Sequence, residues 1–238
     1  MTDTAEASAP EGAPEDAPED APEGATLHYI FDPLCGWCYA AAPLVAAARG
    51  VPGLKVALHG GGMMTGANRR PITPQWREYV MPHDRRITEM TGQPFGERYF
   101  EGLLRDTGAV MDSEPPTTAV LAAESLRAGG GLDMVHRLQQ AHYVEGRRIA
   151  DADVLAEMAV DIGFDAAAFK AAFAQLSGEA TAQHIAESRQ LLQRAGGQGF
   201  PTFVLVQPDG RASRIDAGPW LGRADDWKAK LAALAEGA

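Results

Sequence analysis

The stretch FDPLCGWCYAAAPLV, residues 31–45, contains both cysteines of the 238-residue chain. Two residues separate Cys35 from Cys38. At this spacing a cysteine pair can close a small ring, share a metal ion, or exchange a thiol for a disulfide. The segments on either side of the pair indicate which of these three roles it has.

The predicted elements place the pair at the start of a helix. Residues 26–31 (TLHYIF) predict a strand that stops in a turn, and residues 37–49 predict an Ala- and Leu-rich helix that Pro43 should bend. Residues 54–60 (LKVALHG) predict a second strand, so a parallel strand pair is favoured. Backbone N–H groups at the helix start lack intrahelical partners and favour a thiolate at Cys35.

The rest of the chain completes an α/β pattern. Residues 60–197 predict mostly helices, including short ones within 74–92 and one that Asp112 or Ser113 should cap. Residues 201–218 predict a strand, a turn and a strand, and residues 224–236 predict a closing helix. We therefore predict one domain from residues 26–62 and 197–238, ordered βαβ then ββα, with residues 63–196 inserted as a helical domain.

The first 25 residues are predicted to be a disordered acidic tail. They repeat Ala, Pro and Glu, and they hold eight acidic residues and no basic one. Such a segment has no large apolar side chain to bury. The formal charge is −11 for the whole chain but only −3 without these residues, so the remainder has no basic stripe for nucleic acid.

Composition also argues against a membrane segment and a metal site. No apolar run reaches membrane-spanning length, and no basic residue precedes Arg49 to start a signal peptide. We therefore expect a cytoplasmic protein. The six histidines are scattered without zinc-type spacing, so we predict no metal and no cofactor beyond the cysteine pair, with glutathione as a candidate reductant. The excess of Arg over Lys is typical of a GC-rich bacterial genome.

Three passages carry a resemblance to a known family. They are YIFDPLCGWCYAAAPL, AHYVEGRRIADADVLAEMAVDIGFD and GGQGFPTFVLV. Together they resemble the DsbA-like thioredoxin superfamily, in particular its FrnE-like branch of cytoplasmic proteins predicted to be protein-disulfide isomerases. The resemblance runs from about residue 26 to the end of the chain. It implies a thioredoxin-like fold that carries a helical insertion.

The motif and the resemblance point to a thiol–disulfide oxidoreductase. Cys35 is expected to be the nucleophile, and Cys38 one helical turn further is expected to resolve the mixed disulfide. The resemblance implies that Pro201 is a cis-proline facing the cysteines, which would leave the Phe200 backbone and Thr202 to contact substrate. A proline that simply starts a strand is the alternative.

Two further residues near the motif are candidate site residues. Asp32 could pass a proton to or from Cys38, or it could only cap the turn that follows it. Trp37 stands between the cysteines, where some relatives have His or Pro, and we expect it to form a hydrophobic lip for substrate. The substrates are expected to be protein or small-molecule thiols and disulfides, and the electron partner is unknown.

Two other functions fit the same fold. One is a glutathione-dependent transferase or isomerase, like the kappa-class transferases and the 2-hydroxychromene-2-carboxylate isomerases. In these a Ser usually stands at the position of Cys35, so the retained pair argues against them. The other is a binding module whose active site is redox-inactive, in which neither thiol would react faster than free cysteine. The sequence does not distinguish oxidase, reductase and isomerase, which share these residues and differ in potential.

Overall fold

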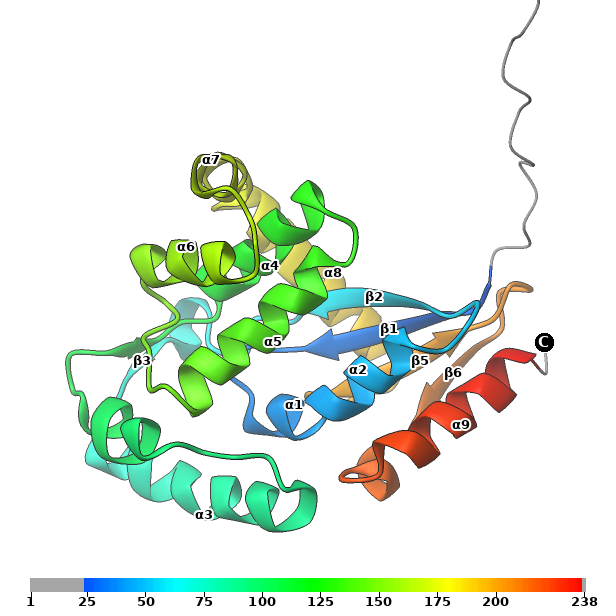
Figure 1. Ribbon diagram of the computed structural model, residues 1–238, viewed down its shortest axis with the longest axis horizontal. Helices are drawn as coiled ribbons and strands as arrows, with labels where there is room; N and C mark the ends of the chain where they lie inside the picture. Colours follow the sequence, from blue (N-terminus) through cyan, green and yellow to red (C-terminus); the bar gives the residue numbers. More distant parts are fainter. Residues whose placement is uncertain (1–23, 237–238) are drawn as a thin grey trace, which may run out of the picture.

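The computed structural model describes residues 24–236 and is built around a four-stranded sheet. The strand order is β2 (Lys55–Gly60), β1 (Thr26–Phe31), β5 (Thr202–Val206) and β6 (Ala212–Ile215). β1 pairs parallel with β2 and antiparallel with β5, and β5 pairs antiparallel with β6 (Figure 1). The predicted α/β fold class is confirmed. The predicted tail lies outside the described residues, apart from Gly24 and Ala25.

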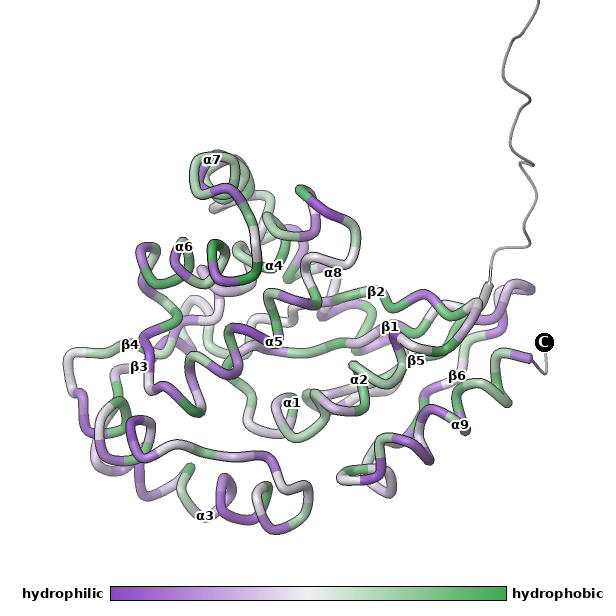
Figure 2. The backbone as a smooth tube through the Cα atoms, in the orientation of Figure 1, coloured by the Kyte–Doolittle hydropathy of each residue, from purple (hydrophilic) through white to green (hydrophobic). Residues whose placement is uncertain are grey.

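The sheet is buried on both faces around its central strands. Helices α2 (Ala42–Arg49) and α9 (Ala224–Glu236) pack against each other over one face, and α8 (Glu179–Arg194) contacts β2 from behind (Figure 1). The rings of Tyr29, Phe31 and Phe203 stack within the core. Figure 2 shows mainly hydrophobic colouring along the central strands. Strand β1 therefore ends inside the protein, which holds the residues that follow it in a defined place.

The helix predicted over residues 37–49 is two helices, which corrects the expectation of one bent helix. The first, α1, spans Gly36–Ala40, and α2 begins at Ala42. Pro43 lies in the first turn of α2, where its missing N–H costs nothing, and it has no N–H to continue the hydrogen bonding of α1. The break separates the short cysteine helix from the helix that packs on the sheet.

All elements between β2 and β5 belong to the inserted segment. Its helices are α3 (Pro74–Thr91), α4 (Glu114–Leu126), α5 (Gly130–Tyr143), α6 (Ala152–Asp161), α7 (Ala166–Leu176) and α8. Helix α4 lies at the centre and contacts α5, α6, α7 and α8. A small sheet pairs β3 (Arg70–Pro71) with β4 (Val110–Met111), which the sequence did not indicate.

Helix α3 is longer than the short helices predicted there. It runs 18 residues through Pro82 and ends at Gly92, which has a left-handed backbone conformation. Pro82 has no N–H, so the carbonyl of Glu78, four residues earlier, has no hydrogen-bond donor within the helix. Both residues are exposed, so water can donate to that carbonyl. After α3 the chain forms a π-helical turn, η2 (Arg98–Gly102), and a 3₁₀ turn, η3 (Leu103–Arg105). Helix α3 and η2 lie at the end of the molecule that faces α1 (Figure 1).

Candidate active site

The cysteine pair lies at the junction of β1 and α1, as predicted. Cys35 is the N-cap residue of α1, and its carbonyl accepts from the N–H groups of Cys38 and Tyr39 at 3.0 and 3.1 Å. Both cysteines are free thiols. Cys35 is 6% exposed and borders a cleft, whereas Cys38 is 0% exposed. The structure therefore gives the two sulfurs different access to the cleft.

Cys38 is held in a desolvated position. Burial raises the pKa of the Cys38 thiol, and the neighbouring Cys35 raises it further. The Tyr29 hydroxyl donates to the Cys38 carbonyl at 3.3 Å. Cys38 is thus a thiol that needs a base before it can attack another sulfur.

The chain around Pro201 faces the cysteines. The Phe200–Pro201 peptide bond is cis, as the resemblance implies, and the Cys35 thiol donates to the Phe200 carbonyl at 3.5 Å. A Cβ on Gly61 would lie 2.2 Å from the Phe200 ring, so only glycine fits beneath it. The resemblance implied this place for Pro201, and the structure puts the residue before it in contact with the Cys35 sulfur.

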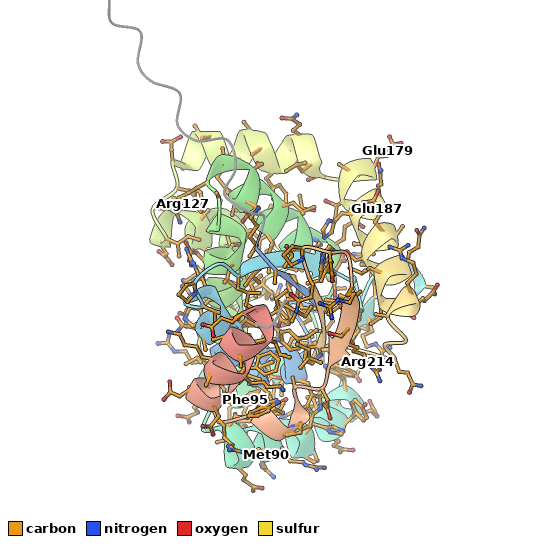
Figure 3. The ribbon with its side chains drawn as sticks, turned by 90° about the vertical axis from the view of Figure 1, so that its right-hand side faces the viewer. Met90, Phe95, Arg127, Glu179, Glu187 and Arg214 are labelled. Atoms are coloured by element: carbon orange, nitrogen blue, oxygen red, sulfur yellow. The ribbon has the colours of Figure 1, made fainter. Side chains whose placement is uncertain are left out.

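Thr202 and Trp37 border a groove of about 480 Å³ on this side of the site. The Thr202 hydroxyl donates to the Gly199 carbonyl at 2.8 Å, so it holds the turn before β5. Trp37 is half-buried and separates this groove from the larger cleft beside Cys35. The groove continues to Arg214 on the edge strand β6, which Figure 3 labels.

Asp32 is fully buried and makes three hydrogen bonds. Its Oδ1 accepts from the Leu34 N–H and the Ser113 hydroxyl, each at 2.9 Å, and its Oδ2 accepts from the Met63 N–H. Burial raises the pKa of Asp32 to about 6, although the three hydrogen bonds and Arg189 oppose this shift. The bond to Leu34 is the turn cap considered above. The raised pKa also suits Asp32 to proton transfer near neutral pH.

Two residues that support Asp32 were missed by the sequence analysis. The Ser113 hydroxyl donates to Asp32 and accepts from the Met64 N–H, so Ser113 is the N-cap residue of α4 without a side-chain capping bond. The neighbouring Asp112 Oδ1 accepts from the Glu114 N–H at 3.0 Å. Arg189 on α8 donates to the carbonyls of Gly61 and Gly62. These bonds fix the loop that carries the Met63 N–H to Asp32. The sequence marked Ser113 only as a candidate helix cap, and no local pattern marked Arg189.

The cleft beside Cys35 has a volume of about 940 Å³. One wall is the cysteine motif, and the other is formed by the β3 region and α3. Its lining includes aromatic and cationic side chains, among them Trp37, Trp76, Tyr79, Arg69 and Arg70. The Arg70 guanidinium lies 5.0 Å from the centre of the Trp76 ring. The lining also includes Asp84 of α3, an acid that the sequence analysis did not select.

Two other features are absent from residues 24–236. These residues contain no cluster of three or more His, Cys, Asp or Glu side chains that could hold a metal ion. Within the same part of the chain, no helix is both long and apolar enough to span a bilayer.

A family model for the DSBA-like thioredoxin domain matches residues 26–222. The chain belongs to this family. A search of curated proteins found no match. The DSBA-like assignment agrees with the strand order, the position of the cysteines and the cis bond described above.

Solved structures of similar proteins support the same family. The cytosolic disulfide reductase DsbM from Pseudomonas aeruginosa is 55% identical, with a TM-score of 0.84 over 90% of this chain and 100% of that one. A second DsbM structure, with GSH, is 54% identical over 88% and 98% of the two chains, with a TM-score of 0.81. A provisionally named protein disulfide isomerase from Nitrosomonas europaea is 26% identical over 88% and 97%, with a TM-score of 0.73. The protein is a thiol–disulfide oxidoreductase of the DSBA-like family.

Proposed function

We propose that this oxidoreductase works as a glutathione-linked disulfide reductase, with Cys35 as nucleophile and Cys38 as resolving thiol. Its substrates are small-molecule or protein disulfides that enter the cleft beside Cys35. Its compartment is the cytoplasm, where thiol buffers keep such a pair reduced.

The observation that carries the proposal is the unequal access of the two sulfurs. Cys35 borders the 940 Å³ cleft, and its thiol faces the Phe200 carbonyl. Cys38 is closed off behind it, one helical turn away. An incoming disulfide can therefore reach Cys35, while the mixed disulfide that forms can be reached from inside only by Cys38.

The reducing direction and glutathione rest on the chemistry of the cleft and on DsbM. Glutathione carries two carboxylates, and Arg69 and Arg70 line the cleft. DsbM, described as a cytosolic disulfide reductase, shares 55% of its residues with this chain, and one of its structures is with GSH. We propose that glutathione returns the electrons that the pair passes to substrate.

The proposed cycle has two exchange steps. The Cys35 thiolate attacks one sulfur of the substrate, the substrate S–S bond breaks, and one thiol leaves. Asp32 then accepts the proton of Cys38, which attacks the Cys35 sulfur and expels the second thiol. The Cys35–Cys38 disulfide that results has given two electrons to the substrate. Two glutathione molecules restore the dithiol and leave as glutathione disulfide.

The redox potential of the pair tests the direction. We expect equilibration in glutathione buffers to give a value in the range of about −200 to −270 mV, where reductases and glutaredoxins lie. A value near −120 mV, typical of a strong oxidant, would contradict a reductase. A parallel assay with a chlorinated aromatic acceptor tests the transferase alternative, and conjugation of glutathione in that assay would favour it.

A further inference from the structure

Asp84 is a second buried acid of the site, and it comes from the inserted segment. It lies on α3, 4% exposed, and its Oδ2 accepts from the Tyr99 hydroxyl at 3.0 Å. It lines the same cleft as Cys35. Burial raises the pKa of Asp84 to about 7, and the bond from Tyr99 works against this rise. An acid with such a pKa can both give and take a proton near neutral pH.

Gly36 allows this acid to lie directly against the cysteine motif. A Cβ on Gly36 would lie 3.2 Å from Asp84 Oδ1 and 3.2 Å from the Ile87 side chain. That separation is tighter than ordinary van der Waals contact. The residue after Cys35 therefore has no side chain on the side from which the carboxyl group approaches. The close approach joins α3 to α1 at the reactive end of the cleft.

The surroundings of Asp84 contain few charges that would fix its ionisation. Tyr99 faces it from η2, and Tyr143 of α5 interacts electrostatically with Asp84 and with both cysteines. On the side of the cleft, the basic side chains are Arg69, Arg70 and the neighbouring His83 of α3. No ion pair involving Asp84 occurs in the part of the chain that the structure describes. The Asp84 carboxyl group thus accepts from one neutral hydroxyl and borders the cleft that Cys35 also borders.

We propose that Asp84 is the proton donor for the first thiol that leaves the substrate. This inference rests on the proposed reductase function and assigns one of its steps. When Cys35 thiolate attacks a disulfide, the substrate S–S bond breaks and its electron pair goes to the leaving sulfur. Asp84 gives that sulfur its proton and becomes a carboxylate. When glutathione later reduces the Cys35–Cys38 disulfide, the incoming thiol returns a proton to Asp84 and attacks as a thiolate.

Two acids then serve two sulfurs, one inside the protein and one in the cleft. Asp32 acts on Cys38 and does not line the cleft, whereas Asp84 does. A leaving thiol of high pKa needs a proton donor more than one of low pKa, because the latter leaves readily as thiolate. Dependence on Asp84 should therefore vary with the leaving group.

The test compares Asp84→Asn with wild type on two anionic disulfides in single-turnover reactions of the reduced full-length protein. Glutathione disulfide releases a thiol of high pKa, and dithiobis-nitrobenzoate releases one of low pKa. We expect Asp84→Asn to slow the reaction with glutathione disulfide about 10- to 100-fold. The reaction with dithiobis-nitrobenzoate should change less than about threefold. Glu89→Gln removes an exposed carboxyl group from the same helix and is the matched control.

A pH profile separates proton donation from a structural role. Both rates depend on the ionisation of Cys35, so this dependence cancels in their ratio. In wild type, the rate with glutathione disulfide should fall relative to the rate with dithiobis-nitrobenzoate as pH rises through about 7. Tyr99→Phe removes the bond that lowers the pKa of Asp84, so it should move this fall to higher pH. It also provides the test if Asp84→Asn does not fold.

The outcomes distinguish this inference from the proposed function. Equal loss with both disulfides, no loss with either, or a pH profile unchanged in Tyr99→Phe would overturn the role of Asp84 while leaving the reductase intact. A wild-type protein that reacts with neither disulfide would overturn the proposed function itself.

Discussion

Asp32→Asn gives a measurable test of the buried acid beneath the cysteines. The pKa of Asp32 is about 6 in the folded protein, against 3.8 for a free aspartate. The folded state therefore holds this proton more tightly than the unfolded state does. Below the pKa of the unfolded state, the Asp32 carboxyl group is neutral in both states and does not lower the free energy of unfolding. As pH rises through 3.8 toward 6, wild type loses stability, and above that the cost is about 3 kcal/mol.

Asparagine at position 32 does not titrate, but its NH₂ group replaces one of the two carboxylate oxygens that accept hydrogen bonds. Its amide NH₂ must face either the Met63 N–H or the pair of donors at Oδ1. A buried donor left without an acceptor costs about 1–3 kcal/mol, and this cost does not change with pH. The variant should therefore be the less stable protein in acid. It should gain about 2 kcal/mol relative to wild type between about pH 4.5 and 7.5.

Urea unfolding of the reduced proteins at several pH values measures this difference. Glu89→Gln removes an exposed carboxyl group and is the matched control. If the stability curves of wild type and Asp32→Asn stay parallel over this range, Asp32 does not titrate near pH 6, and its proposed exchange of a proton with Cys38 loses its basis.

Three further predictions concern other residues. Cys38→Ala should accumulate a glutathione mixed disulfide, seen by mass spectrometry as one added glutathionyl group, and Cys35→Ala should not. Burial lowers the pKa of His142 from 6.5 to about 4, because the folded protein holds the imidazole neutral. The contribution of His142 to stability is therefore present above pH 6.5 and is lost as pH falls toward 4. His142→Phe should reduce the acid slope of stability by up to about 1.4 kcal/mol per pH unit in urea titrations. Arg189→Met should lower stability by about 1–2 kcal/mol, because two loop carbonyls lose their donor, and should raise the pKa of Asp32, measured by NMR titration.

Each of these three has a result that would contradict it. Glutathione bound equally to both single-cysteine variants would remove the distinction between nucleophile and resolving thiol. An unchanged acid slope in His142→Phe would mean that the imidazole is not held neutral. An unchanged Asp32 titration in Arg189→Met would mean that the guanidinium does not act on the carboxylate.

Local patterns in the sequence were sufficient to place the cysteine pair. The strand at residues 26–31 and the helix that follows it depend on side-chain alternation and helix propensity within a few residues. Pro201 could be placed beside β5 for the same reason, although its position facing Cys35 came from the resemblance to a family. Pro43 marked a disturbance in the helix, but whether it bends or breaks depends on how α2 packs on the sheet.

Only the tertiary structure brought Asp84 against the cysteine motif, and Ser113 and Arg189 to the surroundings of Asp32. They come from the inserted segment, on α3, at the start of α4 and on α8, 46 to 151 residues beyond Cys38. Their side chains carry no local signature, because an acid, a hydroxyl and a guanidinium on a helix usually face water. The sequence by itself determined where the cysteine pair lies. The packing of the insertion against the sheet decided which acids are buried near that pair, because burial and proximity, and not residue type, set the pKa of an acid.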